Sequence, residues 1–198
     1  AKALIDAPML ESKSYGDYNF PHVLAAAAIG RYLSVPYDKI SEALTTWEPR
    51  NNRSQWMAHR GHGVVLDAYN ANPDSMQAAL GHFGRMDHPH KALLLGEMLE
   101  LGEHSEYEHR FLLENLLRDP WGVCCLVGEA FWNLRAEFPT FHFFERAEDL
   151  HRFLWASRWP ASAVLVKGSR GNAMEQYLDS LPWADPKTGQ EVATSTTS

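Results

Sequence analysis

The sequence is poor in the features that mark several classes of protein. Of its 198 residues, 18 are Lys or Arg and 25 are Asp or Glu, which gives a net charge of −7. Non-specific binding to nucleic acid needs clustered basic side chains, so this balance disfavours it. No apolar run is long enough to cross a membrane, and the first residues lack the pattern of a secretory signal. We therefore expect a cytoplasmic protein with no membrane or nucleic-acid partner.

Cysteine is scarce, with two residues in the chain. Cys124 and Cys125 are adjacent within an apolar run, and consecutive side chains of a strand point to opposite faces of a sheet. Two such thiols are poorly placed to form a disulfide with each other. We expect them to be reduced and buried, as is usual in the cytosol.

Glycine-rich phosphate loops are also missing. Neither G-x-x-x-x-G-K-[ST] nor G-x-G-x-x-G occurs, and no internal repeat is evident. These residues therefore contain no phosphate-binding loop of either kind.

What the sequence does have is a regular alternation of apolar strands and amphipathic helices from residue 62 onward. Repeated strand–helix units predict a parallel sheet with helices on both faces, which is an α/β fold of the Rossmann-like class. The expected strands cover 62–67, 91–96, 122–127, 141–144 and 162–167, with an edge strand at 55–59, and the expected helices cover 73–85, 104–118, 129–137, 146–157 and 171–180.

The domain organisation follows from what lies on either side of this alternation. Two helical segments come first, from Pro21 to Leu33 and over 38–46, and a polar segment at 47–52 then breaks helix. We place a domain boundary there, so that residues 1–47 form a short helical part and residues 48–183 form the Rossmann-like domain. Residues 184–198 are rich in Thr and Ser, and we expect a disordered tail.

One stretch, residues 64–76, organises the rest of the chain. Its first three residues form an apolar run typical of a buried strand. Asn72 is a good N-cap, Pro73 suits the first helical position, and Asp74 favours the positive end of a helix. Residues 67–72 are thus expected to form a polar loop at the carboxyl end of a buried strand, where open α/β sheets bind ligands.

This stretch also carries a resemblance. Residues 67–76, Asp-Ala-Tyr-Asn-Ala-Asn-Pro-Asp-Ser-Met, resemble a signature in the C-terminal domain of the Mur ligases. A weaker similarity lies at 95–102, where Glu97 stands in place of the expected Asp. The resemblance runs from about Tyr15 to Leu181. Three further matches follow the order of the family, namely Tyr18-Asn19, Asn51-Asn52-Arg53-Ser54-Gln55 and Val166-Lys167-Gly168-Ser169-Arg170.

The resemblance implies an ATP-dependent amide ligase of peptidoglycan precursor synthesis. It is strongest with the branch that adds D-alanyl-D-alanine to UDP-N-acetylmuramoyl-tripeptide through an acyl-phosphate intermediate. ATP and Mg²⁺ are the implied cofactors, and the family holds both chiefly in a central domain. Residues 1–47 are then a remnant of that central domain, and residues 48–183 are the C-terminal domain. We expect the isolated chain to fold without ligating, and to need the N-terminal and central domains.

The resemblance also implies roles for residues on the nucleotide side. Asp67 is expected to accept hydrogen bonds from the ribose of ATP, and Arg53 to reach the nucleotide with its guanidinium. Asn19 has an amide that can pair with the adenine edge, although helix capping is an equal alternative. His22 stands where the family usually has a second Asn, which weakens that contact. Asn70 is expected near the nucleotide.

A second set of residues is expected on the peptide side. Tyr69 and Asn72 lie in the polar loop, although Asn72 is better explained as a helix cap. Lys167, Ser169 and Arg170 form a basic turn before the last expected helix, and such a turn binds anions. The alternative for this turn is a surface charge cluster.

No metal site is expected in this sequence. An acidic and His-containing group follows the second strand, but its spacing fits no metal motif, and acids are favoured at helix starts in any case. Its members are Glu97, Glu100, Glu103, His104 and His109.

Two other functions remain open. A five-unit α/β domain with Asp67, Glu97 and Lys167 at strand ends also resembles a phosphorylation-switch receiver. A receiver needs a phosphorylatable Asp after its third strand, where this chain has Val127 and Gly128. A non-catalytic binding fragment is the other alternative.

Overall fold

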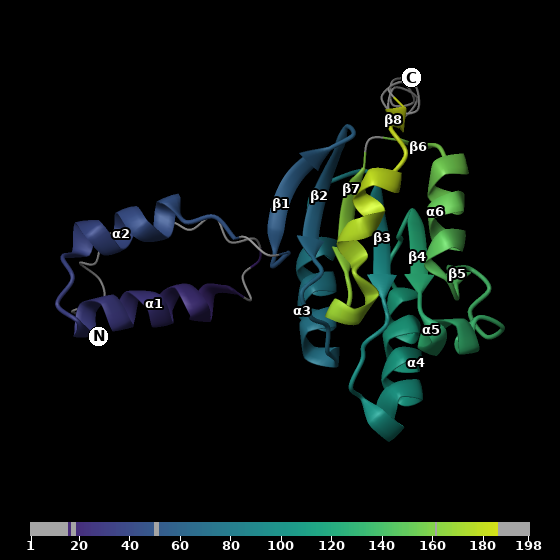
Figure 1. Cartoon of the computed structure of the whole chain (residues 1–198), viewed down its shortest axis with the longest axis horizontal. Helices are drawn as coiled ribbons and strands as arrows, with labels where there is room; N and C mark the ends of the chain where they lie inside the picture. The colour runs from purple at the N-terminus through teal and green to yellow at the C-terminus, as the bar shows by residue number, and fades with distance from the viewer. Residues whose placement is uncertain (1–15, 17–18, 50–51, 161, 186–198) are drawn as a thin grey trace, which may run out of the picture.

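The computed structural model describes Gly16 and residues 19–49, 52–160 and 162–185 of the chain. Two helices that run in opposite directions form an arm beside an α/β sheet domain (Figure 1). The helices of this arm are α1 (Phe20–Tyr32) and α2 (Tyr37–Thr46). Val23 and Ile40 are its buried residues, and Gly30 permits close packing, since a methyl group there would lie 3.0 Å from the Ile40 side chain.

The sheet has six strands in the order β1-β2-β7-β3-β4-β5. β1 is antiparallel to β2, and all the other neighbours are parallel. The last long strand, β7, returns to lie between β2 and β3, which places Lys167 opposite Asp67. The strand bounds are β1 (Gln55–His59), β2 (His62–Asp67), β3 (Lys91–Gly96), β4 (Val123–Val127), β5 (His142–Phe144) and β7 (Ala163–Lys167).

Helices cover both faces of the sheet, as the sequence predicted. One apolar cluster joins the sheet to α3 (Pro73–Gly84), α4 (Ser105–Leu116) and α5 (Glu129–Leu134). A second cluster joins the other face to α6 (Ala147–Ala156) and the 3₁₀ helix η5 (Met174–Ser180). Strands buried on both faces read as continuous apolar runs, which explains why this sequence predicts them well. The α/β fold class is confirmed.

The two thiols follow the same alternation. Cys124 belongs to the first cluster and Cys125 to the second, so they point to opposite faces of β4. Both are free and buried, as expected.

Helix α3 begins as the sequence predicts. The Asn72 side chain accepts a hydrogen bond from the Ser75 N–H at 2.8 Å, and the Ser75 hydroxyl accepts one from the Asn72 N–H at 3.1 Å. Pro73 follows at the first helical position. This reciprocal cap fixes where the polar loop ends and the helix starts.

The prediction of a helix at 171–180 is wrong about the type of helix. The segment forms two 3₁₀ helices, η4 (Arg170–Asn172) and η5, separated by Ala173 at φ +45°. The cause is Met174, which is fully buried over the backbone of Gly96 and Gly168. A methyl group on Gly168 would lie 2.7 Å from Met174 Cγ and 3.0 Å from Gly96 Cα. This packing draws the chain inward and breaks a continuous α-helix.

The expected tail also needs a correction at its start. Ala184 and Asp185 form a short strand, β8 (Ala184–Asp185), which pairs with β6 (Trp159–Pro160). The Ala184 N–H donates to the Arg60 carbonyl at 2.9 Å, and this tie holds the segment on the β1–β2 turn. Residues 186–198 lie outside the described residues. Within the described ranges no helix has the length and apolar character to span a membrane.

Candidate functional site

The centre of the candidate site is an ion pair between the ends of two neighbouring strands. Lys167 Nζ lies 2.7 Å from Asp67 Oδ2, and it also donates to the Asn70 carbonyl at 3.1 Å. The Lys167 side chain is 1% exposed, whereas that of Asp67 is 14% exposed. The pair lies at the carboxyl edge of the sheet, where the sequence placed Asp67, and it is held from beneath by the lysine.

The second Asp67 oxygen holds the segment that precedes β1. Oδ1 accepts hydrogen bonds from the Ser54 N–H at 3.0 Å and from the Ser54 hydroxyl at 3.3 Å. The backbones of Asn52 and Ser54 have φ values of +59° and +45°, which residues other than glycine adopt uncommonly. Such conformations persist only where surrounding contacts fix them. Asp67 supplies two of those contacts for Ser54.

Arg53, between these two strained residues, is exposed and stacks on the polar loop. Its guanidinium carbon lies 3.7 Å from the centroid of the Tyr69 ring. Tyr69 is itself 43% exposed, so the stack lies at the surface. Cation and ring thus orient each other beside Asp67.

Three of the expected nucleotide residues meet in one cavity of about 540 Å³. Asn19 and His22 contribute from the arm, while Arg53 contributes from the segment before β1. Asn19 occupies the N-cap position of α1, but its side chain makes no capping hydrogen bond. The capping alternative for Asn19 is therefore wrong. The cavity is also lined by Val23, Ala26, Ala43, Leu44, Trp47, Pro49 and Ser54.

The other expected site residues have different surroundings. Asn70 is exposed, and its side-chain oxygen accepts from the Ala71 N–H at 2.9 Å. The amide oxygen of Asn72 caps α3. The Ser169 hydroxyl is buried, donates to the Ala71 carbonyl at 3.3 Å and accepts from the Leu99 N–H at 2.9 Å.

The basic turn at 167–170 differs in part from both arrangements expected for it, and its binding of an anion stays a prediction. Lys167 is buried, so the turn is not a surface charge cluster, and no α-helix starts at its end. Arg170 is exposed and pairs with Glu175 at 2.5 Å. The turn thus has one cation at the surface, Arg170, and one that is buried, Lys167. Tyr18 and Asn51, which belong to the expected motifs, lie outside the described residues.

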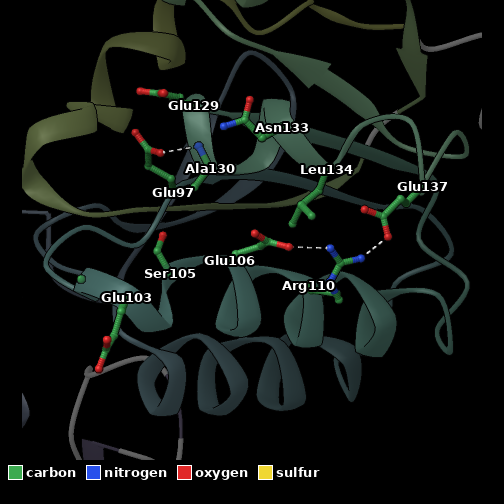
Figure 2. A pocket seen from close by; sticks show the side chains of 11 residues that line it. Glu97, Glu103, Ser105, Glu106, Arg110, Glu129, Ala130, Asn133, Leu134 and Glu137 are labelled. Carbon is green, nitrogen blue, oxygen red and sulfur yellow. Dashed lines mark hydrogen bonds and ion pairs between the residues drawn. The ribbon is translucent and has the colours of Figure 1, made fainter.

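A second cavity, of about 510 Å³, lies over the carboxyl ends of β3 and β4 (Figure 2). Its walls are acidic, and Arg110 pairs there with Glu106 at 2.9 Å and with Glu137. Glu97 accepts the Ala130 N–H at 2.9 Å, which caps α5. In the part of the chain that the structure describes, no three His, Cys, Asp or Glu side chains are grouped to hold a metal ion.

Sequence reasoning missed the role of His109. It is fully buried; its Nε2 accepts the Met98 N–H at 2.9 Å, and its Nδ1 lies 2.7 Å from the Ser105 carbonyl. Burial lowers the pKa of His109, and the bond to Ser105 opposes that shift. His109 therefore anchors the loop after β3. Its helical spacing with the buried residues Leu112, Leu113 and Leu116 is the signal that could have identified it.

Comparisons with known proteins agree with this geometry. Residues 52–170 match the family model described as Mur ligase, glutamate ligase domain. A Bacillus subtilis protein named UDP-N-acetylmuramoyl-tripeptide–D-alanyl-D-alanine ligase is 32% identical over 175 residues, which is 84% of this chain and 38% of that protein. A Mycobacterium tuberculosis protein of the same name is 38% identical over 101 residues, covering 48% of this chain and 20% of its own length.

Solved structures give the same result for the fold. A crystal structure of MurF from Acinetobacter baumannii superposes with a TM-score of 0.73 at 28% identity, covering 84% of this chain and 38% of that one. MurF from Thermotoga maritima in complex with ADP gives a TM-score of 0.60 at 23% identity, covering 77% and 35%. The chain thus spans between a fifth and two fifths of the length of these relatives.

Proposed function

Because this chain belongs to the Mur ligase family, we propose that it is the carboxyl-terminal part of an ATP-dependent amide ligase. The relatives named above act on UDP-N-acetylmuramoyl-tripeptide and D-alanyl-D-alanine, and we propose the same two substrates here. The proposal places the protein in the cytoplasm, where the peptidoglycan precursor is assembled. The observation that carries it is the meeting of Asn19, His22 and Arg53 in one cavity beside Asp67.

The proposed reaction joins two substrates through an activated carboxyl group. The terminal carboxylate of the tripeptide attacks the γ-phosphorus of ATP, which releases ADP and leaves an acyl phosphate. The amine of D-alanyl-D-alanine then attacks the acyl carbon, phosphate leaves, and the amine loses a proton. Phosphoryl transfer of this kind depends mainly on positioning and charge neutralisation. The amide bond forms without any change in oxidation state.

In that reaction, this chain is proposed to bind the nucleotide and to supply residues that face the dipeptide. Asn19 and His22 offer polar groups for the base, and Arg53 offers a cation for phosphate. Asn70 is proposed for the nucleotide side, and Tyr69 and the turn that contains Arg170 for the dipeptide side. Tyr69 stacks on Arg53, so the two sides adjoin each other. The described residues offer no fitting set of metal ligands, so we assign no step on this chain to Mg²⁺.

The arm is proposed to be the end of the central ATP-binding domain, with the sheet domain beginning near residue 48. The arm exposes several large apolar side chains, which a neighbouring domain of the complete polypeptide would cover. They are Phe20, Leu24, Ile29, Tyr32, Leu33 and Trp47. Since the sequence contains no G-x-x-x-x-G-K-[ST] loop, we expect the 198 residues alone not to ligate.

Nucleotide binding is the first test. Calorimetric titration of the purified chain with ADP should show binding, and Arg53→Ala should weaken it by about 10- to 100-fold, the range for losing a charged hydrogen bond. Arg118→Ala is the matched control. Arg118 is exposed between α4 and β4, near the amino ends of the parallel strands and away from the candidate site at their carboxyl ends. Absence of ADP binding, or equal binding by Arg53→Ala, contradicts the proposal.

Ligation is tested in a complete enzyme. The matching part of the Bacillus subtilis relative is replaced by residues 52–185, and D-alanyl-D-alanine transfer is followed by mass spectrometry. The hybrid should form product and lose it with Arg53→Ala. If the hybrid folds and binds ADP but joins no dipeptide to the tripeptide, the substrate is a different one. Phosphate release by the 198 residues alone, with both substrates present, would refute their expected inactivity.

A further inference from the structure

Lys167 is buried where the end of β7 meets the end of β2 and the polar loop, which lie about a hundred residues earlier in the sequence. Its side chain is 1% exposed, and its ammonium group contacts Asp67 at the end of β2 and the carbonyl of Asn70 in the polar loop. A group so enclosed has little access to a ligand. It also balances the negative charge of the Asp67 carboxylate, with which it forms an ion pair.

The first path from Lys167 leads to the backbone of Arg53. Asp67 uses Oδ2 for the lysine and Oδ1 for Ser54, at 3.0 Å from the Ser54 nitrogen. Ser54 and Asn52 both have left-handed backbone conformations on either side of Arg53. Since such conformations need fixing contacts, the position of Arg53 depends on a carboxylate that Lys167 holds in place.

The second path leads to the side chain of Arg53. Its guanidinium stacks on Tyr69 at 3.7 Å, and Tyr69 is next to Asn70, whose carbonyl accepts a hydrogen bond from Lys167. Both the backbone and the side chain of Arg53 are therefore fixed through contacts that end at the same ammonium group.

We infer that Lys167 is a positioning residue that holds Arg53 toward the cavity of about 540 Å³ and links it to the loop at 69–72. The inference rests on the proposed function, because it takes Arg53 as a contact to nucleotide phosphate. It departs from the sequence-based expectation that Lys167 itself meets the peptide substrate or its phosphate. It also explains why a lysine is buried next to a largely buried carboxylate.

The test is a double-mutant cycle read by ADP binding to the purified chain. Lys167→Met should weaken ADP binding by about tenfold in the native background and by less than about twofold in the Arg53→Ala background. A residue that touches the nucleotide itself would weaken binding equally in both backgrounds, and that result would overturn the inference. Adenosine, which lacks phosphate, should bind equally well to the native chain and to Lys167→Met.

Two further measurements keep the test decisive. Removing one partner of a buried pair destabilises a protein, so each variant is first checked by thermal unfolding. If Lys167→Met does not fold, Lys167→Gln replaces it, since its amide donates to Asp67 and Asn70 without charge and should restore part of the affinity. Tyr69→Leu, at an exposed position, should also weaken ADP binding only when Arg53 is present.

The outcomes separate this inference from the proposed function. If the native chain does not bind ADP, the proposed function fails. If it binds ADP, and Arg53→Ala weakens binding while Lys167→Met and Lys167→Gln do not, the proposed function stands and the positioning role is wrong.

Discussion

His109 offers the sharpest test of how the chain supports its candidate site. It is fully buried, accepts the Met98 N–H at 2.9 Å, and meets the Phe131 ring edge-on at 4.8 Å between centroids. Through Met98 it holds the loop after β3, whose next residue, Leu99, donates to Ser169. A leucine at position 109 fills similar space without the acceptor.

The expected cost of His109→Leu can be worked from these contacts. A buried N–H left without a partner costs about 1–3 kcal/mol, and a lost aromatic pair costs about 0.5–1.5 kcal/mol. The Ser105 carbonyl keeps its helical partner, so it adds little. The free energy of unfolding should fall by about 1.5–4.5 kcal/mol, which lowers the unfolding midpoint by roughly 3–18 °C for a chain of this size.

The assay is urea and thermal unfolding followed by tryptophan fluorescence. His104→Leu is the matched control, since His104 is exposed in the preceding turn, and it should change the free energy of unfolding by less than about 0.5 kcal/mol. A cost below about 1 kcal/mol for His109→Leu would refute the anchoring role, because a partnerless buried N–H alone should cost that much.

The pH dependence of stability gives an independent check. Burial lowers the pKa of His109 below its ordinary value of 6.5, and burial also lowers that of His62. As the pH falls through 6.5, the unfolded chain binds more protons than the folded one. The free energy of unfolding therefore has its full value above pH 6.5 and decreases below it. His109→Gln can keep both hydrogen bonds without titrating, and it should lose less stability than the native chain between about pH 7.5 and about pH 5.5. An equal or larger loss would contradict this.

Three further predictions follow from the packing. Asn72→Ala removes the N-cap of α3 and should lower the free energy of unfolding by about 1 kcal/mol, whereas Asn72→Asp should keep most of it; equal losses in a urea titration would show that the cap contributes little. Gly168→Ala forces a methyl group against Met174 and should cost about 1–3 kcal/mol, and an unchanged unfolding midpoint would contradict this close packing. Burial raises the pKa of both Cys124 and Cys125, so neither thiol should react with a disulfide reagent until urea unfolds the chain; rapid labelling of the native protein would contradict their burial.

The sequence by itself determined the elements and the family. Strands covered on both faces are continuous apolar runs, and the N-cap of α3 is a local pattern, so β2, β3 and the start of α3 were predicted to the residue. The ordered motifs, which are also local, indicated the Mur ligases, and the family match agrees.

Only the tertiary structure decided which side chains meet. The insertion of β7 between β2 and β3 brings Lys167 to Asp67 across a hundred residues, and no local pattern encodes that pairing. The same holds for Met174, whose burial over Gly96 and Gly168 replaced an expected α-helix with two 3₁₀ helices. Periodicity records which faces of an element are buried, but the partner on each face depends on strand order, which is a property of the whole chain.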